Sequence, residues 1–343
     1  MDNLEISKEN YLNSYNFARR SNIVFTEIVS IKEYEEIKNE NHKIIYQEKN
    51  EVCYLNTKFK IYENDIVFSN TDFIKILFKY LNKIKTLNNI KLITHWSDLT
   101  IDKSLFIKKP KCISTWFGTH INFKNSSLIA LPLGLSGEYS PKNLISKFFI
   151  NTSNTKKERK ANLLYLNFQK NTNEKERALI EDKLKSFDWV KFDQPNLTLN
   201  EYLNELQNSE FVLCPYGNGL DTHRLWETLY AGSIPIIKNH ITYKTTENLP
   251  VLMIDNYEEI NEKFLRQKLL EIRMQNYENR KLDIGFWFNI INSIKKESND
   301  DIEIEISNFD FLKLKFSYVF SKFFKRQLKK IVFRLKQILK IFN

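Results

Sequence analysis

Short apolar runs alternate with polar, helix-like segments along most of this chain. Runs that suit buried strands lie at residues 42–47, 64–70, 90–95, 111–117 and 127–135. Between two of these runs, residues 71–85 carry apolar side chains at helical spacing, which predicts a helix. Residues 1–40 are mostly polar and are predicted as helix, with one short apolar run at residues 22–25.

The alternation stops at residues 151–160, NTSNTKKERK, which contain no apolar residue and are predicted as a linker. Beyond them it starts again. Strands are predicted at 162–168, 189–192, 211–215, 233–238 and 249–255, and helices at 173–187, 198–208 and 257–273. Two of the helices begin with capping-box spacing, Asn173 with Glu176 and Thr198 with Glu201.

Strands that alternate with helices form parallel sheets with helices on both faces. The sequence therefore predicts an α/β protein with two Rossmann-like domains that face a cleft. The predicted boundaries are 1–155 for the first domain, 156–298 for the second, and 299–343 for a C-terminal tail. A chain of 343 residues that is 42% hydrophobic is long enough for two cores.

Residues 214–236, CPYGNGLDTHRLWETLYAGSIPI, contain three of the seven glycines in the chain. They follow a predicted strand, and ligands in parallel sheets bind beyond the carboxyl ends of the strands. Gly217 and Gly219 are expected to take positive φ and to let a ligand approach the backbone. Ala231 and Gly232 are expected to let the end of the following helix pack close to the sheet.

The helix that follows this loop carries side chains suited to a phosphate and a ribose. Asp221 or Thr222 is expected to cap the helix, whose N-terminal amides favour an anion. Arg224 in the first turn suits a phosphate, and Glu227, three residues later, lies on the same face. A carboxylate there can accept hydrogen bonds from the hydroxyls of a ribose.

A glycine-rich turn can also serve geometry alone, and Arg224 with Glu227 can be a simple surface pair. The combination of loop, helix start and side chains favours a nucleotide diphosphate site over that alternative. The predicted donor-binding residues are Tyr216, Gly217, Asn218, Gly219, Asp221, His223, Arg224 and Glu227.

The segment PYGNGLDTHRLWETLYAGSIPII resembles the donor-binding segment of exostosin-like glycosyltransferases, with its Pro-Gly loop, its Arg and its Glu three residues later. Weaker similarities to the microbial branch of this family lie in THWSD, WFGTH, LPLGL and LYLNF, at residues 94–98, 116–120, 131–135 and 164–168. The resemblance covers roughly residues 60–300. His120 stands where this family leads us to expect Asn.

This resemblance implies the GT-B architecture, with an acceptor-side domain, a nucleotide-sugar donor domain and a cleft between them. The implied reaction is the transfer of a sugar from a nucleotide-sugar to a cell-surface glycan acceptor, which is expected to be lipid-linked. The sequence contains no D-x-D motif, of the kind with which metal-dependent transferases hold a diphosphate-bound cation. We therefore expect no metal and no other cofactor, with the helix dipole and Arg224 stabilising the leaving diphosphate.

An inverting transfer needs a general base for the acceptor hydroxyl. Asp98 and His95 end the predicted strand at 90–95 and are the expected catalytic residues, Asp98 ahead of His95. The structural alternatives are a helix cap for Asp98 and a strand-end hydrogen bond for His95. His120 and Glu138 follow other strand-like runs on the same side. Trp116 and Phe117 suit either the core, which is favoured, or a platform for a sugar ring.

The net charge of +10 is confined to the tail, because residues 311–343 contain ten Lys or Arg and no acid. The rest of the chain is formally neutral, which argues against nucleic acid as a partner. Apolar residues from 319 to 342 recur every three or four positions, so the tail is predicted as a basic amphipathic helix on an anionic membrane. A final helix packed on the fold is the alternative.

The sequence contains no apolar stretch long enough to span a bilayer, its polar N-terminus does not suit a signal peptide, and its three cysteines lie far apart. These features predict a cytoplasmic protein, peripheral at the inner face of the cytoplasmic membrane. A non-catalytic nucleotide-sugar-binding or scaffold protein at the membrane is the alternative function, and a nucleic-acid-binding protein is a third.

Overall fold

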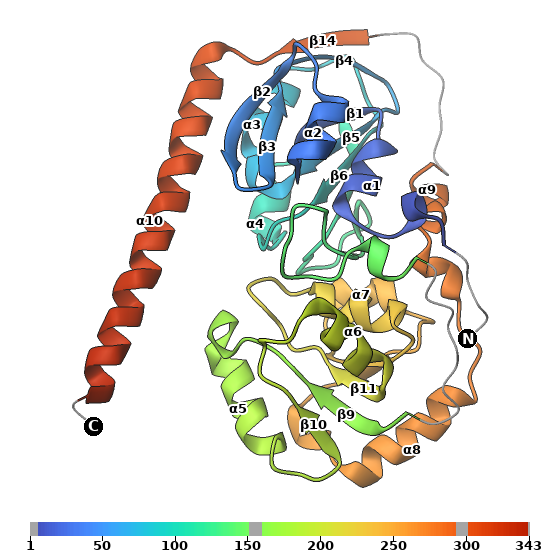
Figure 1. Cartoon of the computed structure of the whole chain (residues 1–343). Helices are drawn as coiled ribbons and strands as arrows, with labels where there is room; N and C mark the ends of the chain where they lie inside the picture. Colours follow the sequence, from blue (N-terminus) through green and yellow to red (C-terminus); the bar gives the residue numbers. More distant parts are fainter. Residues whose placement is uncertain (1–5, 151–159, 293–300, 342–343) are drawn as a thin grey trace.

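The computed structural model describes residues 6–150, 160–292 and 301–341. These residues form an α/β protein with two main sheets, one of seven strands and one of five, stacked one above the other in the view of Figure 1. The predicted α/β class and the parallel sheets are thus confirmed. The linker predicted at 151–160 lies outside the described residues except for Lys160, and the domain boundaries remain predictions.

The first sheet has the strand order β2-β3-β1-β5-β6-β7-β8. Its strands are β1 (Ile23–Ser30), β2 (His42–Glu48), β3 (Glu51–Asn56), β5 (Ile66–Asn70), β6 (Ile90–His95), β7 (Ile113–Gly118) and β8 (Leu128–Ala130). Strand β3 is antiparallel to both of its neighbours, and the remaining pairs are parallel. The α-helices of this half are α1 (Ser14–Arg19), α2 (Ile31–Ile37), α3 (Ile74–Leu81) and α4 (Lys103–Phe106).

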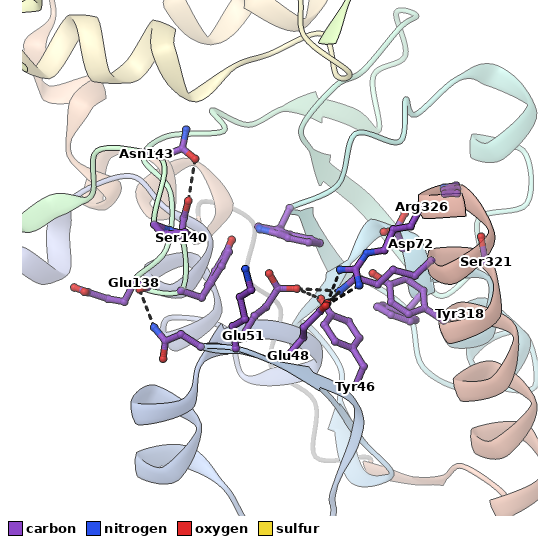
Figure 2. Close-up of a pocket in the computed structure, with 18 of the residues that line it drawn as sticks. Tyr46, Glu48, Glu51, Asp72, Glu138, Ser140, Asn143, Tyr318, Ser321 and Arg326 are labelled. Atoms are coloured by element: carbon purple, nitrogen blue, oxygen red, sulfur yellow. Dashed lines mark hydrogen bonds and ion pairs between the residues drawn. The ribbon is translucent and has the colours of Figure 1, made fainter. Parts of the chain in front are cut away.

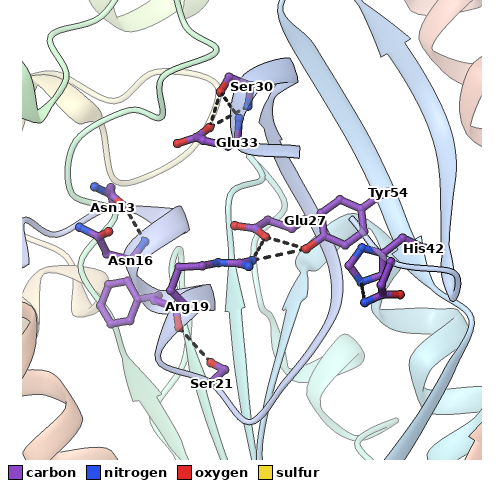
Figure 3. A network of polar contacts seen from close by, with 11 residues as sticks. Asn13, Asn16, Arg19, Ser21, Glu27, Ser30, Glu33, His42 and Tyr54 are labelled. Carbon is purple, nitrogen blue, oxygen red and sulfur yellow. Dashed lines mark hydrogen bonds and ion pairs between the residues drawn. The ribbon is translucent and has the colours of Figure 1, made fainter. Parts of the chain in front are cut away.

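The prediction of a polar helix over residues 1–40 is confirmed for α1 and α2 but was wrong for β1, a central strand that lies between them. Its polar residue Glu27 is fully buried and forms an ion pair with Arg19 (Figure 3). The hydroxyl of Tyr54 donates a second hydrogen bond to Glu27, at 2.9 Å. Burial raises the pKa of Glu27 to about 7, and Arg19 opposes that shift. These partners come from other elements, so the local pattern could not reveal them.

The second sheet is entirely parallel, in the order β10-β9-β11-β12-β13. Its strands are β9 (Asn162–Leu166), β10 (Val190–Phe192), β11 (Ser209–Leu213), β12 (Ile234–Lys238) and β13 (Leu252–Ile254). The α-helices of this half are α5 (Glu174–Leu184), α6 (Leu199–Gln207), α7 (His223–Tyr230), α8 (Glu262–Arg273) and α9 (Ile284–Asn292).

The two predicted capping boxes had different outcomes. At the start of α6, Thr198 and Glu201 form the reciprocal pair of hydrogen bonds, as predicted. At the start of α5, the side chain of Asn173 makes no capping bond, so that prediction was wrong. Glu176 instead accepts a hydrogen bond from the hydroxyl of Tyr257, which lies near the start of α8.

The core is continuous between the two halves of the chain. One cluster of buried side chains joins Phe117 and Leu131 of the first half to Trp226 and Tyr243 of the second. Trp116 is also fully buried and donates to Thr94, so Trp116 and Phe117 are core residues, as the favoured alternative predicted, and do not form a sugar platform.

The C-terminal segment begins with a strand that the sequence did not predict. Strand β14 (Asp301–Glu305) pairs antiparallel with β4 (Lys58–Tyr62), and ion pairs join Glu303 to Lys58 and Asp301 to Lys60. Helix α10 (Asn308–Ile341) follows and runs down the side of the molecule from the first sheet (Figure 1). Within the described residues, no helix has the length and apolar character needed to cross a membrane.

Candidate functional site

A cavity of about 990 Å³ is lined by residues that follow the carboxyl ends of parallel strands in both sheets. The first half contributes Asp72, Asp98 and His120, which follow β5, β6 and β7. The second half contributes Asn167 after β9 and the loop of residues 217–222 after β11. Strand ends of both sheets therefore meet at one cavity, as ligand sites in this kind of sheet require.

The glycines of the loop act through the space they leave and not through positive φ, so the φ prediction for Gly217 and Gly219 was wrong. A Cβ at Gly219 would lie 2.6 Å from the ring of His120. A Cβ at Gly217 would lie 3.3 Å from a guanidinium nitrogen of Arg177. Gly232 does have positive φ, at +77°, and its Cβ would meet no atom within 4 Å. It is therefore needed for the left-handed turn that ends α7, and not for close packing.

Arg224 lies in the first turn of α7 and lines the cavity. Its Nε donates to the hydroxyl of Tyr202, at 3.3 Å. The predicted side-chain cap of this helix is absent, because Thr222 makes no capping bond and the only backbone amide of this helix start that donates to the Asp221 carboxylate is that of Thr222 itself.

Arg177 of α5 is a second cation in the cavity, which the sequence analysis missed. Its side chain is 5% exposed and donates to the backbone carbonyls of Tyr216, Gln169 and Pro215, at 2.8, 3.1 and 3.3 Å. The pKa of Arg177 is lowered to about 10, mainly by burial and also by the nearby charge of Arg224. The signal that could have found it is its place in the first turns of the helix that follows the first strand of this sheet.

Glu227 lines the same cavity, although only 2% of it is exposed. One carboxylate oxygen accepts from the amide of Leu144, and the other from the hydroxyl of Tyr202, both at 3.1 Å. Burial raises the pKa of Glu227, while His223 and Arg224 oppose the rise. Tyr202 thus connects Glu227 to Arg224, a link that residue spacing could not predict.

Asp221 and His223 connect the loop to the first half of the chain. A carboxylate oxygen of Asp221 accepts from the amide of Leu133, at 3.0 Å, and both oxygens accept from the indole of Trp226. His223 donates from Nδ1 to the carbonyl of Gly134, at 2.8 Å. Both residues line the cavity, and both also hold the two halves together.

The two remaining predicted donor residues lie at different depths. Asn218 is exposed and lines the cavity. Tyr216 is partly buried, does not line that cavity, and stacks on the ring of Tyr243 with centroids 6.3 Å apart. The structure thus brings seven of the eight predicted donor residues to the cavity wall and sets Tyr216 behind it.

The two predicted catalytic residues occupy different environments. Asp98 is exposed on the wall of the cavity. His95 is buried behind it, accepts from the amide of Trp96 at Nδ1 and donates from Nε2 to the carbonyl of Pro132, at 3.0 and 3.1 Å. Burial lowers the pKa of His95 to about 3. Both ring nitrogens of His95 are therefore already used by the backbone.

His120, which stands where the family resemblance led us to expect Asn, joins the two halves. Its Nδ1 accepts from the amide of Asp221, at 3.0 Å, and its ring packs against Gly219. Its φ is +55°, which is uncommon for a residue with a side chain. Burial lowers its pKa to about 4, so the imidazole is neutral at neutral pH.

Comparison with protein families identifies the part of the chain that carries most of this site. Residues 141–300 match the RXYLT1 C-terminal domain. The match confirms the predicted resemblance to exostosin-like glycosyltransferases, and with it an enzyme of the glycosyltransferase type. This RXYLT1-type segment contains both cavity arginines and Glu227, whereas Asp98 and His120 lie before it.

Fifteen solved chains match this one, and three of them have TM-scores between 0.32 and 0.36. A crystal structure of an α1,3-fucosyltransferase has a TM-score of 0.36 and 15% identity, covering 67% of this chain and 78% of that one. An α1,3-fucosyltransferase with GDP-fucose has a TM-score of 0.33 and 14% identity, covering 70% and 81%. A GtfA/B complex has a TM-score of 0.32 and 13% identity, covering 68% and 55%.

Comparison with curated proteins finds no match. Within residues 6–150, 160–292 and 301–341, no group of three or more His, Cys, Asp or Glu is arranged to hold a metal ion.

Proposed function

We propose that this protein is a glycosyltransferase of GT-B architecture, in which the RXYLT1-type segment binds a nucleotide-sugar and the first half supplies the acceptor side. The observation that carries the proposal is the pair of guanidinium groups, Arg177 and Arg224, in one cavity. Within the described residues, their hydrogen-bond partners are backbone carbonyls and a hydroxyl, and neither donates to a carboxylate. Arg177 is buried and Arg224 is half-buried, and two such cations side by side suit an anion that arrives with the substrate.

The leaving group of sugar transfer is such an anion. As the bond between the sugar and the diphosphate breaks, negative charge grows on the diphosphate, and preorganised cations stabilise that charge. Arg224 and the first turn of α7 are placed for this role, with Arg177 beside them. Each oxygen of Glu227 keeps a lone pair after its one hydrogen bond, so Glu227 can still accept from a ribose hydroxyl.

For the general base we propose Asp98, because it is exposed at the cavity across from the RXYLT1-type segment. Asp72 lines the same cavity and accepts a hydrogen bond from Ser97, at 2.8 Å, so it is the alternative carboxylate. His95 is not carried into the proposal, because its two nitrogens already bond to the backbone. We propose no metal and no other cofactor, since the arginines supply the positive charge that the leaving group needs.

The acceptor is proposed to be a glycan linked to a membrane lipid, with the protein peripheral at the inner face of the cytoplasmic membrane. The support comes from α10, whose outward face exposes large apolar side chains at Phe309, Leu312, Phe316, Val319, Phe320, Phe323 and Phe324. The acid-free basic sequence from residue 311 onward complements an anionic lipid surface. Nucleic acid is not proposed, because the rest of the chain is formally neutral.

A panel of nucleotide-sugars, assayed for hydrolysis and for transfer, tests the enzyme, with calorimetric binding of UDP and GDP measured alongside. We expect one nucleoside diphosphate to bind and the matching nucleotide-sugar to be hydrolysed slowly in water. Binding without any turnover would favour the alternative, a non-catalytic nucleotide-sugar-binding or scaffold protein at the membrane. Binding of neither nucleotide would contradict both.

A further inference from the structure

A second cavity, of about 1300 Å³, lies between α10 and the first half of the chain (Figure 2). One wall is formed by the β2–β3 hairpin around Glu48 and Glu51, and another by the loop that contains Glu138. The third wall is the inner face of α10, with Tyr318, Ser321 and Arg326. None of these residues is among the predicted donor-binding or catalytic residues.

This second cavity is joined to the donor cavity. Asp72, Trp96, Tyr139 and Tyr318 are among the residues that line both of them. Asp72 is the carboxylate beside Ser97, on the same wall as Asp98. A molecule in the second cavity can therefore extend one end to the carboxylates that face the donor.

Tyr318 is held firmly at this junction. Its ring stacks on Tyr46 with centroids 5.4 Å apart and lies 4.8 Å from the ring of Phe73. Two turns further along the helix, Arg326 makes a bidentate ion pair with Glu48, at 2.6 Å for each bond. The start of α10 is fixed as well, because Asp310 accepts from Lys79 and Tyr80, both at 2.7 Å.

The lining of the second cavity suits a saccharide. Its aromatic side chains at the junction, Trp96, Tyr139 and Tyr318, offer apolar faces, while Ser140 and Asn143 offer groups that bond hydroxyls. Trp96 also has a φ of +52°, a strained conformation for a bulky residue. Such strain is concentrated at functional sites, where the surrounding structure enforces it.

We propose that this cavity binds the saccharide acceptor and that α10 is a structural part of the acceptor site, with Tyr318 as its aromatic contact. The inference rests on the proposed function, because an acceptor requires a donor. In the transfer, the acceptor hydroxyl oxygen bonds to the sugar carbon as the bond from that carbon to the diphosphate breaks. The hydroxyl proton goes to the proposed general base, Asp98 or its alternative Asp72, and the bonding electrons leave with the nucleoside diphosphate.

The same helix then has two functions on two faces. Residues 314, 318, 321, 322 and 325 line the cavity, whereas residues 316, 320 and 323 are exposed on the opposite side. A helix that rests on a membrane with its outer face would thus bring a lipid-linked saccharide to the cavity beneath its inner face.

A thiol-protection experiment on the full chain tests the binding site without an identified acceptor. The three native cysteines are buried, so a Ser321→Cys variant carries one accessible thiol at the cavity wall. The probes are methyl glycosides and disaccharides of neutral hexoses and N-acetylhexosamines, with UDP or GDP present. At about ten times its Kd, a bound saccharide should slow maleimide labelling about tenfold.

The matched control is Phe320→Cys, one position away on the outer face of α10. Protection of Cys at 321 but not at 320 supports the proposal. Equal protection at both positions, or protection at neither across the whole panel, overturns it. Calorimetric binding of UDP or GDP to the same samples separates this failure from a failure of the donor site.

A kinetic comparison gives a second, independent readout. Tyr318→Ala should raise the acceptor KM about three- to tenfold, the range for loss of an aromatic contact. Since Tyr318 also lines the donor cavity, the comparison is between two losses, and transfer should fall more than nucleotide-sugar hydrolysis in water. Phe320→Ala is the control and should change neither. A second altered protein covers the case in which Tyr318→Ala detaches the helix. A maleimide attached to the thiol of Ser321→Cys occupies space in the cavity and should block transfer while hydrolysis continues. Unchanged transfer in both altered proteins, or equal loss of transfer and hydrolysis, overturns the proposal.

Discussion

Arg177 and Arg224 share one aromatic neighbour, with their guanidinium carbons 5.6 and 6.0 Å from the centre of the Phe168 ring. The two residues come from different helices, α5 and α7, and are 47 positions apart in the sequence. Burial is the main cause of the lowered pKa of Arg177, and the charge of Arg224 adds to it. An anion bound between the two guanidinium groups would offset their repulsion, so the pair should make the largest contribution to donor affinity.

Arg224→Ala should weaken binding of the preferred nucleoside diphosphate by about 1.5–3 kcal/mol, the range for a hydrogen bond to a charged group. Affinity for the free nucleoside should hardly change, because it has no phosphate. Titration calorimetry with UDP and GDP measures both. Lys185→Ala, in an exposed ion pair beyond the end of α5, is the control cation. Unchanged diphosphate affinity in Arg224→Ala would show that the donor site lies elsewhere.

Glu227→Gln tests the ribose contact while keeping the size of the side chain. The amide oxygen can still accept from Leu144, and the amide group can donate to Tyr202, so the fold should be retained. We expect nucleoside diphosphate affinity to fall by about 1–2 kcal/mol, while inorganic diphosphate binds as before. Calorimetry with the two ligands distinguishes these effects. An equal loss for both ligands would assign Glu227 to the phosphate side or to the fold.

Asp98→Asn should keep donor binding and lose hydrolysis of the nucleotide-sugar, because it removes a base without changing the arginines. General-base catalysis contributes about 10²–10⁴-fold to a rate, and a loss of that size is expected. Asp72→Asn is the comparison, since Asp72 lines the same cavity. Full activity in Asp98→Asn with loss in Asp72→Asn would transfer the role of base to Asp72.

The membrane contact of α10 is best tested by substitution. Removing all residues after 310 would also delete Phe311, which is buried in the core of the first half. Replacing Phe316, Phe320 and Phe323 together with Ser should leave donor binding intact and greatly reduce sedimentation with anionic vesicles. Each buried Phe contributes about 1.5–3 kcal/mol, or at least tenfold in affinity.

Vesicles of neutral lipid and a salt series separate the two contributions to membrane binding. Added salt should weaken binding of the natural sequence, and the apolar face should retain a residual affinity. Equal sedimentation of the natural and triply substituted proteins would mean that the exposed phenylalanines do not face lipid.

The buried imidazoles predict a loss of stability in mild acid. The pKa of His95 is about 3 and that of His120 about 4 in the folded protein, against about 6.5 in an unfolded chain. Below about pH 6.5 the unfolded state binds protons that the folded state excludes, so stability falls as pH falls. In His95→Asn, Oδ1 can still accept from Trp96, and the loss between pH 7 and pH 5 should be smaller by about 1–2 kcal/mol. Urea unfolding at the two pH values measures the difference, and identical pH dependence in both proteins would contradict the assignment.

Much of the fold was predictable because its signals are local. Apolar runs predicted β2, β5, β6, β7 and all five strands of the second sheet. Strands such as β5, β6 and β11 are buried on both faces and need an apolar run, whereas β2 and β10 are only partly buried. Strand β1 was not predicted, because it contains Glu27, whose burial depends on Arg19 and Tyr54 from elsewhere in the chain. Strand β14 was not predicted, because its charged residues pair with Lys58 and Lys60 on a distant strand.

The site shows the same division between local and distant information. The loop, Arg224 and Glu227 were predictable, because a glycine-rich turn between a strand and a helix is a local feature with known ligand chemistry. By itself, then, the sequence determined the α/β class, most of the parallel strands and one side of the candidate donor site. Only the tertiary structure shows that Arg177 lies beside Arg224 and that His95 is buried behind the cavity wall. It also shows that Tyr318 lies at the junction of two cavities. Those relationships join residues far apart in the chain, and packing alone decides which distant residues share a wall.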